Sequence, residues 1–293
     1  MERLPTWIIV GALVVLTAVA AADALRPGPS KPEREAEEAT APGLNGLLVA
    51  ARADCSARGI SLRDFSEQPL RRPVDCRGAV WSYDHSLNAR CRHEFTTVAS
   101  LDSGQILRLR GCSPSWRPDG AVTVIHDGDL LVARRRGRPF VFLSREELAA
   151  ELAGKLQGGR AYDLREVARH GAVAFAGIVA GPKPWQRALV YYTPEGVTGV
   201  IPELGRDISG VRVSPLGNIA FARGEAGREY VMVDPSGNEI PLPRIGNAYA
   251  IAWSDDERWV AVSTRTATFI ARTGTRRIVM RLALGGETLE WLE

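Results

Sequence analysis

Short stretches in which apolar and polar residues alternate recur along residues 46–292, separated by turns rich in Asp, Gly, Pro and Ser. Alternation with a period of two predicts half-buried β-strands. The clearest example is a unit of four strands joined by three turns: Val211–Ser214, Ile219–Ala222, Glu229–Asp234 and Glu239–Leu242. Residues 250–280 repeat this unit. The pattern therefore predicts an all-β fold built from four-stranded units.

The first strand of each unit ends at an apolar residue, usually Trp, followed by a turn. These positions are separated by steps of 35, 51, 46, 40 and 38 residues. Spacing of this size is typical of repeat proteins, and four strands per repeat indicate a β-propeller. We expect the tryptophans of this set to pack between blades. The six positions are Trp81, Trp116, Val167, Val213, Trp253 and Trp291.

The two ends of the repeat array are incomplete in complementary ways. Residues 46–74 supply three strands without a first strand, whereas Thr288–Leu292 is a first strand without the other three. Pairing them would close the ring and remove the exposed edges of an open array. The predicted fold is thus a six-bladed β-propeller closed by a C-terminal strand, with five blades as the alternative.

One helix is predicted between the third and fourth blades. Ser144 and Glu147 have the spacing of a capping box. They are followed at helical spacing by Leu148, Leu152 and Leu156, and Gly158-Gly159 is the predicted stop. The segment is therefore expected to form a short inserted amphipathic helix.

The four cysteines repeat with the blades, because Cys55 and Cys91 lie 36 residues apart, as do Cys76 and Cys112. In a propeller blade the second and fourth strands end on the same face. This geometry favours two disulfides, Cys55 with Cys76 and Cys91 with Cys112. A metal site is the alternative, although the spacings lack the close C-x-x-C pairs that zinc prefers.

The amino-terminal region has a different composition from the rest of the 293 residues. Trp7–Ala22 is an uninterrupted apolar run, so residues 1–25 are expected to be either an uncleaved transmembrane helix or a cleaved signal peptide. Residues 26–43 are rich in Pro and Glu and read as a disordered stalk. Residues 44–293 would form the propeller domain, membrane-anchored on the extracytoplasmic side, or secreted if cleavage occurs.

The charge of the chain argues against nucleic acid as a partner. The net charge is +3, and residues 1–43 contribute four basic and six acidic groups, which leaves +5 on the propeller domain. This is too little for a phosphate-binding surface. Arg134–Arg138 is a local run that we expect to be a solvated turn, with contact to an acidic polymer or lipid headgroups as the alternative.

Catalytic, metal and cofactor signatures are missing from the sequence. His93-Glu94 would need a second histidine at position 97 to match a metallopeptidase helix, but this residue is Thr97. His85, His126 and His170 fall in or beside predicted turns, where solvated histidines are expected. The sequence contains neither a G-x-S-x-G elbow nor a Gly-rich phosphate loop. We therefore expect no enzyme activity, no cofactor and no metal.

The turns Trp116-Arg-Pro-Asp-Gly120 and Trp253-Ser-Asp-Asp256 resemble the WSPDG signature of the TolB-like (PD40) propeller family, over roughly residues 78–292. The resemblance implies a WD40-like, six-bladed propeller used mostly for protein contacts, and it supplies no catalytic residue. The chain departs from the signature at Val167 and Val213, where the aromatic residue is missing.

These observations lead to the hypothesis of a membrane-tethered, non-catalytic module that binds a protein or an envelope component. A propeller hydrolase or lactonase with its site at the central channel, and a structural subunit of an envelope complex, are the alternatives. Partner contact is predicted on the face shared by the disulfides, the helix and the loop of residues 182–187. In that loop Trp185, with Lys183 and Arg187, is the predicted anchor, unless Trp185 folds down as a lid on its own blade.

Overall fold

The computed structural model describes most of the propeller domain. The chain divides into two compact units, Met1–Pro42 and Gly43–Glu293, and the description begins within the second. The predicted segments 1–25 and 26–43 lie outside the described residues. Within the described part, no helix has the length and apolar composition needed to span a membrane. The structure describes residues 44–292 except 71–74, 77–78, 83, 85, 101–103, 136, 171–173, 184, 203–207 and 225–227.

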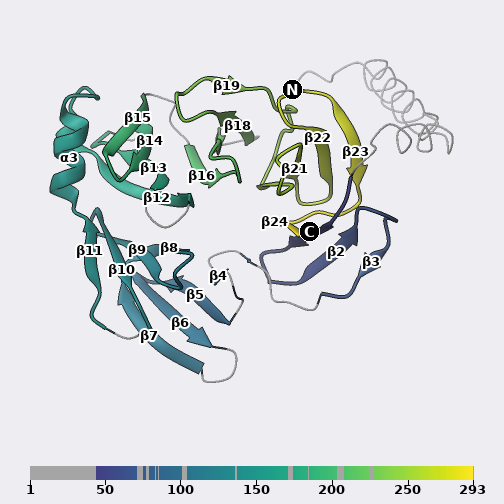
Figure 1. Cartoon of the computed structure of the whole chain (residues 1–293), viewed down its shortest axis with the longest axis horizontal. Helices are drawn as coiled ribbons and strands as arrows, with labels where there is room; N and C mark the ends of the chain where they lie inside the picture. Colours follow the sequence, from purple (N-terminus) through teal and green to yellow (C-terminus); the bar gives the residue numbers. More distant parts are fainter. Residues whose placement is uncertain are drawn as a thin grey trace, which may run out of the picture. The chain divides into compact units, whose positions relative to one another are not determined.

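Six four-stranded antiparallel sheets surround a central axis, which confirms the predicted six-bladed propeller (Figure 1). From the innermost strand outward, the second blade is β4 (Ala79–Trp81), β5 (Leu87–Arg92), β6 (Phe95–Ser100) and β7 (Gly104–Arg110), and the third is β8 (Cys112–Trp116), β9 (Val122–His126), β10 (Asp129–Ala133) and β11 (Phe140–Leu143).

The remaining consecutive blades follow the same order. The fourth is β12 (Asp163–His170), β13 (Ala174–Ala180), β14 (Arg187–Thr193) and β15 (Gly196–Pro202), and the fifth is β16 (Ile208–Val213), β17 (Ile219–Arg223), β18 (Glu229–Val233) and β19 (Glu239–Ile240). The sixth is β20 (Ala250–Trp253), β21 (Trp259–Ser263), β22 (Thr268–Arg272) and β23 (Ile278–Leu282).

The first blade joins the two ends of the propeller domain. Its inner strand is β24 (Thr288–Leu292), which pairs antiparallel with β1 (Leu47–Ala51) and is followed outward by β2 (Ala57–Ser61) and β3 (Glu67–Gln68). Trp291 lies opposite Leu48, and its indole N–H donates to the Asn45 carbonyl at 3.0 Å. The predicted closure by the C-terminal strand is therefore confirmed.

Trp116 and Trp253 pack between neighbouring blades. Trp116, Trp253 and Trp291 are buried, whereas Trp81 is half-buried. The indole N–H of Trp116 donates to the Val80 carbonyl of the preceding inner strand at 3.0 Å, so the ring also bonds two blades together.

Two of the six positions carry valine instead. Val213 ends β16 as predicted, but Val167 lies inside β12, which continues to His170. The inner strand of the fourth blade is thus longer than the repeat pattern indicates, because its pairing with β13 extends to His170 opposite Ala174.

A serine hydroxyl organises the turn after several inner strands. The Ser254 hydroxyl donates to Asp256 at 2.7 Å and accepts the Trp259 N–H at 3.1 Å, and Ser82 forms the same pattern with Asp84 and Leu87. Hydrogen bonds from the neighbouring backbone and serines hold the pKa of both aspartates below the usual value.

The fifth blade lacks this aspartate and takes its acceptor from the sixth blade. Buried Glu257 accepts the Ser214 hydroxyl at 2.7 Å, the Leu216 N–H at 2.9 Å and the Asn218 side-chain amide at 2.7 Å. One carboxylate therefore joins two neighbouring blades.

The inserted helix α3 (Arg145–Ala153) has the predicted capping box between Ser144 and Glu147 and buries Leu148 and Leu152. It ends earlier than predicted, because Gly154 is the C-cap. Leu156 is still buried, held by a turn hydrogen bond to the Leu152 carbonyl ahead of a 3-10 turn, η1 (Gly159–Ala161). Figure 1 shows α3 at the rim, beside β11 of the third blade and β15 of the fourth.

The alternating strand directions define two faces of the propeller. Second and fourth strands end on one face, which also carries all four cysteines and is called the disulfide face below. First and third strands end on the other, called the turn face because it carries the serine-organised turns.

Candidate functional site

Both disulfides fasten one blade to the next on the disulfide face. Cys55 is bonded to Cys76, with Cα atoms 5.2 Å apart, and Cys91 is bonded to Cys112, with Cα atoms 5.3 Å apart. Cys55 lies in the turn after β1, and Cys91 lies near the end of β5; both strands are the second of their blade. Their partners lie at the entry to the following blade, Cys76 just before β4 and Cys112 at the start of β8. The pairing is the one that the repeated spacing predicts.

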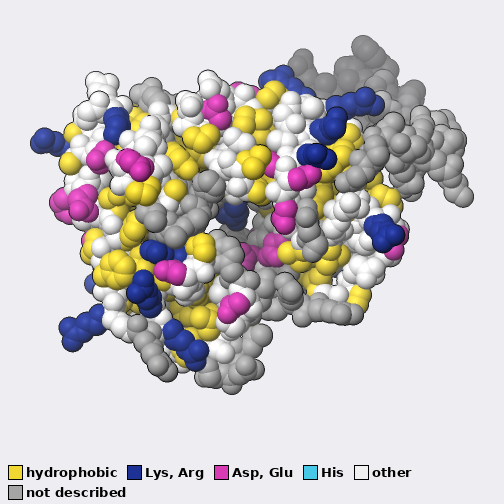
Figure 2. Space-filling model, in the orientation of Figure 1, with side chains coloured by type: hydrophobic (Ala, Val, Ile, Leu, Met, Phe, Trp, Pro, Cys, Tyr) yellow, Lys and Arg dark blue, Asp and Glu magenta, His cyan; other side chains and the backbone are white. Residues whose placement is uncertain are grey.

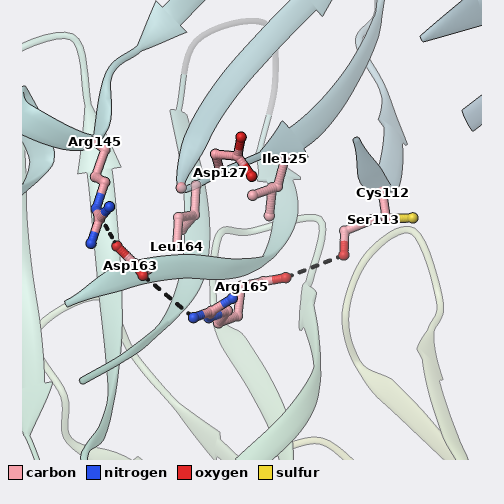
Figure 3. A pocket seen from close by; sticks show the side chains of 9 residues that line it. Cys112, Ser113, Ile125, Asp127, Arg145, Asp163, Leu164 and Arg165 are labelled. Carbon is pink, nitrogen blue, oxygen red and sulfur yellow. Dashed lines mark hydrogen bonds and ion pairs between the residues drawn. The ribbon is translucent and has the colours of Figure 1, made fainter. Parts of the chain in front are cut away.

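A cavity of about 450 Å³ opens beside the second disulfide, between the third and fourth blades (Figure 3). Four elements contribute to it: the start of β8, the β9–β10 turn, the first residue of α3 and the start of β12. The lining residues are Cys112, Ser113, Ile125, Asp127, Gly128, Arg145, Asp163, Leu164 and Arg165.

Two arginines share one aspartate in this cavity. Asp163 forms ion pairs with Arg145 (Nε–Oδ1, 2.5 Å) and with Arg165 (3.4 Å), as the dashed lines in Figure 3 show. The Asp163 side chain is 21% exposed, whereas the arginines are 49% and 61% exposed. Both guanidinium groups therefore keep donors available for a carboxylate or another polar acceptor, in addition to Asp163.

Backbone contacts fix the position of these side chains. The N–H of Arg145 donates to Asp129 at 2.7 Å, and the Ser113 hydroxyl donates to the Arg165 carbonyl at 3.2 Å. Gly128 has φ +91° and leaves room for Arg145, whose side chain would lie 3.2 Å from a Cβ at that position. The cavity is thus a built feature of the interface between these blades.

The loop between β13 and β14 lies on the same face. The Gly181 N–H donates to the Gln186 carbonyl at 2.7 Å and closes the loop, which leaves Trp185 49% exposed. The Lys183 ammonium lies 5.6 Å from the centre of the Trp185 ring. Arg187 has a different environment, because its guanidinium donates to the Ile208 carbonyl at 2.6 Å and joins the fourth blade to the fifth.

Helix α3 extends from the cavity toward the opposite face of the propeller. Its first residue lines the cavity on the disulfide face, whereas Glu151 lies next to Gly196, at the β14–β15 turn on the other face. A depression of about 720 Å³ lies between the helix and the β14–β15 turn and includes Glu147, Glu151 and Tyr192. Burial raises the pKa of Tyr192, and these two carboxylates raise it further.

Around the central axis, inner-strand carboxylates bond to backbone groups of neighbouring blades. Glu166 accepts the Gly210 N–H at 2.6 Å, and Glu290 accepts the Asp75 N–H at 2.7 Å. Figure 2 shows a hollow at the centre of the ring with charged side chains around it. Among the described residues, there is no group of three or more His, Cys, Asp or Glu side chains that could hold a metal ion.

The histidines are placed separately. His93 lies in the β5–β6 turn, and His126 ends β9 with its Nε2 at 3.3 Å from Asp127. His85 and the side chain of His170 lie outside the described residues.

Sequence reasoning missed the cluster of Arg145, Asp163 and Arg165. Asp163 and Arg165 follow Arg145 by 18 and 20 residues, across an irregular insertion. Alternation and repeat spacing give no information about such a segment, so only the capping box, which places Arg145 at the first helical position, was available as a signal.

Comparison with known proteins identifies the fold. Neither a family model nor a curated protein matches this chain. Among solved structures, the β-propeller domain of Cps50 (Swd1) from Myceliophteria thermophila is similar, with a TM-score of 0.53 and 13% identity over 84% of this chain and 87% of that one. The Dos1 propeller matches at a TM-score of 0.47 and 9% identity, covering 83% and 73% of the two chains. A structure described as the eukaryotic initiation factor matches at 0.37 and 11%, covering 82% and 74%.

Proposed function

We propose that this protein is a non-catalytic, TolB-like propeller that binds a protein or another envelope component through its disulfide face. The observation that carries the proposal is the polar cavity between the third and fourth blades, with Trp185 exposed on the same face. Functional residues concentrate on loops held by a rigid scaffold, and the largest insertion, α3 with its flanking turns, begins at this cavity.

The residue types on this face suit protein recognition. Tryptophan and arginine are the side chains most often responsible for binding energy at interfaces. Trp185 offers an exposed aromatic surface, and Arg145 and Arg165 offer guanidinium donors in a cavity. We infer a partner that presents an apolar side chain to Trp185 and an acidic group to the cavity.

The proposed location is outside the cytoplasm, with residues 1–25 as the tether. All four cysteines form disulfides, which persist in oxidising compartments and are rare in the cytosol. The uninterrupted apolar run Trp7–Ala22 supports export or anchoring.

The proposal is tested by placing a photoreactive amino acid at position 185 in the full chain, crosslinking in cells and identifying the captured protein by mass spectrometry. Position 216 is the matched control, because Leu216 is also exposed, at 71%, but lies in a turn on the turn face. We expect a discrete partner from position 185 and none from position 216.

Substitution of the predicted anchor gives a second readout. Trp185→Ala should reduce capture by a photoreactive group at position 165 about tenfold, as expected of a binding hot spot, and leave the melting temperature nearly unchanged. Equal capture from positions 185 and 216 would contradict the proposal. A fall in melting temperature with intact capture would instead identify Trp185 as a lid on its own blade.

A further inference from the structure

The third blade presents an apolar and basic surface on the turn face. Phe140 and Val141, the first two residues of β11, are 48% and 49% exposed. The hairpin that precedes them carries the exposed side chains of Arg134, Arg135 and Arg138. We refer to residues 134–141 as the basic hairpin. In Figure 2, Lys or Arg side chains project from the rim near β7 and β11.

Most of the net positive charge of the propeller domain lies on the second and third blades. Residues 87–143, from the second strand of the second blade to the end of the third blade, contain nine arginines, no lysine and five acidic residues, a net charge of +4. The whole domain carries only +5. An anionic surface would therefore be attracted to these two blades rather than to the ring as a whole, and the basic hairpin is the part of them on the turn face that carries exposed arginines.

An open depression of about 450 Å³ lies between the basic hairpin and the β8–β9 turn, lined by Asp119, Gly120, Arg134 and Arg135. Arg117 pairs closely with Asp119 at 3.1 Å, whereas Arg134 approaches the same carboxylate only to 3.8 Å. The hairpin arginines thus remain available to phosphate oxygens, which guanidinium groups bind through two parallel hydrogen bonds.

The local structure does not suit addition of a partner strand to β11. This edge strand has only four residues, with Pro139 directly before it and α3 starting two residues after its end. Short strands and flanking prolines are features that block edge pairing. Successive residues of a strand point to opposite sides, so the exposure of both Phe140 and Val141 means that the strand end protrudes on both of its sides.

The described chain begins on the same face as the basic hairpin. β1 starts at Leu47, opposite Leu292 at the end of inner strand β24, and first strands end on the turn face. The start of β1 therefore lies on this face, as the third-to-fourth-strand hairpins do.

We propose that the basic hairpin is a lipid contact, in which Arg134, Arg135 and Arg138 bind phosphates of anionic headgroups while Phe140 and Val141 enter the interfacial layer. Exposed apolar residues beside guanidinium groups are the combination that binds membrane interfaces. The contact is independent of the binding proposed for the disulfide face.

The test uses the full chain with Phe140→Trp and vesicles of phosphatidylcholine, with or without phosphatidylglycerol, that contain an acyl-chain nitroxide lipid. Quenching of tryptophan fluorescence is measured as the difference from the unsubstituted chain. Ile278→Trp is the matched control, because Ile278 is 38% exposed and follows Arg276 and Arg277 in the corresponding hairpin of the sixth blade.

We expect quenching at position 140 with phosphatidylglycerol, much less without it, and little at position 278. Adding Arg134→Glu and Arg135→Glu should reduce binding at least about tenfold, since each basic residue near an anionic surface contributes about fivefold. Equal quenching at both positions, or no dependence on phosphatidylglycerol, would overturn the proposal. A third result would also overturn it: vesicles do not quench the Phe140→Trp variant, but its fluorescence responds to poly-glutamate. That result would indicate that the hairpin binds an acidic protein.

Discussion

At the scale of single residues, Glu290 is an ionisable group with a strongly raised pKa. It lies on β24, and burial raises its pKa to about 7 from the ordinary value of 4.5, with a smaller contribution from the nearby Asp75 carboxylate. The Asp75 N–H, which donates to Glu290, acts in the opposite direction. The closing strand of the ring thus carries a carboxyl group that prefers to be neutral.

This preference predicts a pH-dependent stability. Because the pKa of Glu290 is higher in the folded state than in the unfolded state, its contribution to the free energy of unfolding is fully present below pH 4.5. This contribution is lost as the pH rises through about 7 and the carboxyl group ionises. The full loss is about 3 kcal/mol. Glu290→Gln keeps the acceptor and removes the charge, so its free energy of unfolding in urea should match that of the unsubstituted chain at pH 4 and exceed it at pH 8.

Glu287→Gln, a substitution of the same kind just before β24, is the control. If Glu290→Gln destabilises the protein equally at pH 4 and pH 8, the carboxyl group acts only as a hydrogen-bond acceptor.

At the scale of elements, ring closure depends on a single short strand. β24 pairs with β1 along its whole length, and its Trp291 is buried and bonded to Asn45. Removing it leaves β1 as an unpaired edge, which exposes backbone groups and favours aggregation.

Deleting residues 287–293 should therefore abolish cooperative thermal unfolding or lead to aggregation, measured by circular dichroism and light scattering. Trp291→Ala tests the same closure without a truncation and should cost about 3 to 5 kcal/mol. A truncated chain that melts like the full one would show that closure contributes little to stability.

At the scale of the whole molecule, the two proposals use opposite faces. The disulfide face carries the cavity and Trp185, whereas the turn face carries the basic hairpin and the start of β1. A propeller held by its turn face would present the disulfide face away from the lipid, so partner and membrane could be bound together.

Hydrogen exchange of the full chain can separate the two surfaces. Anionic vesicles should slow amide exchange in residues 134–141 and leave residues 181–187 unchanged, and the captured partner should have the reverse effect. Slower exchange in residues 181–187 on vesicles alone would place lipid on the disulfide face and contradict this arrangement.

Much of the fold could be predicted because its signals are local or repeated. Alternation identified the strands, the 36-residue cysteine spacing identified equivalent positions in successive blades, and Ser144 with Glu147 marked the start of the helix. Propeller geometry then made the disulfide pairing and the closing strand follow from strand direction.

Other features depend on distances between segments that no local pattern encodes. The Arg145–Asp163–Arg165 cluster, the acceptor role of Glu257 for the neighbouring blade and the burial of Glu290 arise only when separate turns and strands are packed together. The same holds for Phe140 and Val141, which are apolar but lie at an outer strand end and stay exposed.

The sequence by itself thus determined the blade unit and predicted its closure and six blades, with five as the alternative, because backbone hydrogen bonding and side-chain alternation are local constraints repeated along the chain. Only the tertiary structure decided where charges meet, which carboxylates lose water and which apolar side chains stay exposed. Those properties depend on solvent exclusion by residues far away in sequence, and solvent exclusion exists only in the folded ring.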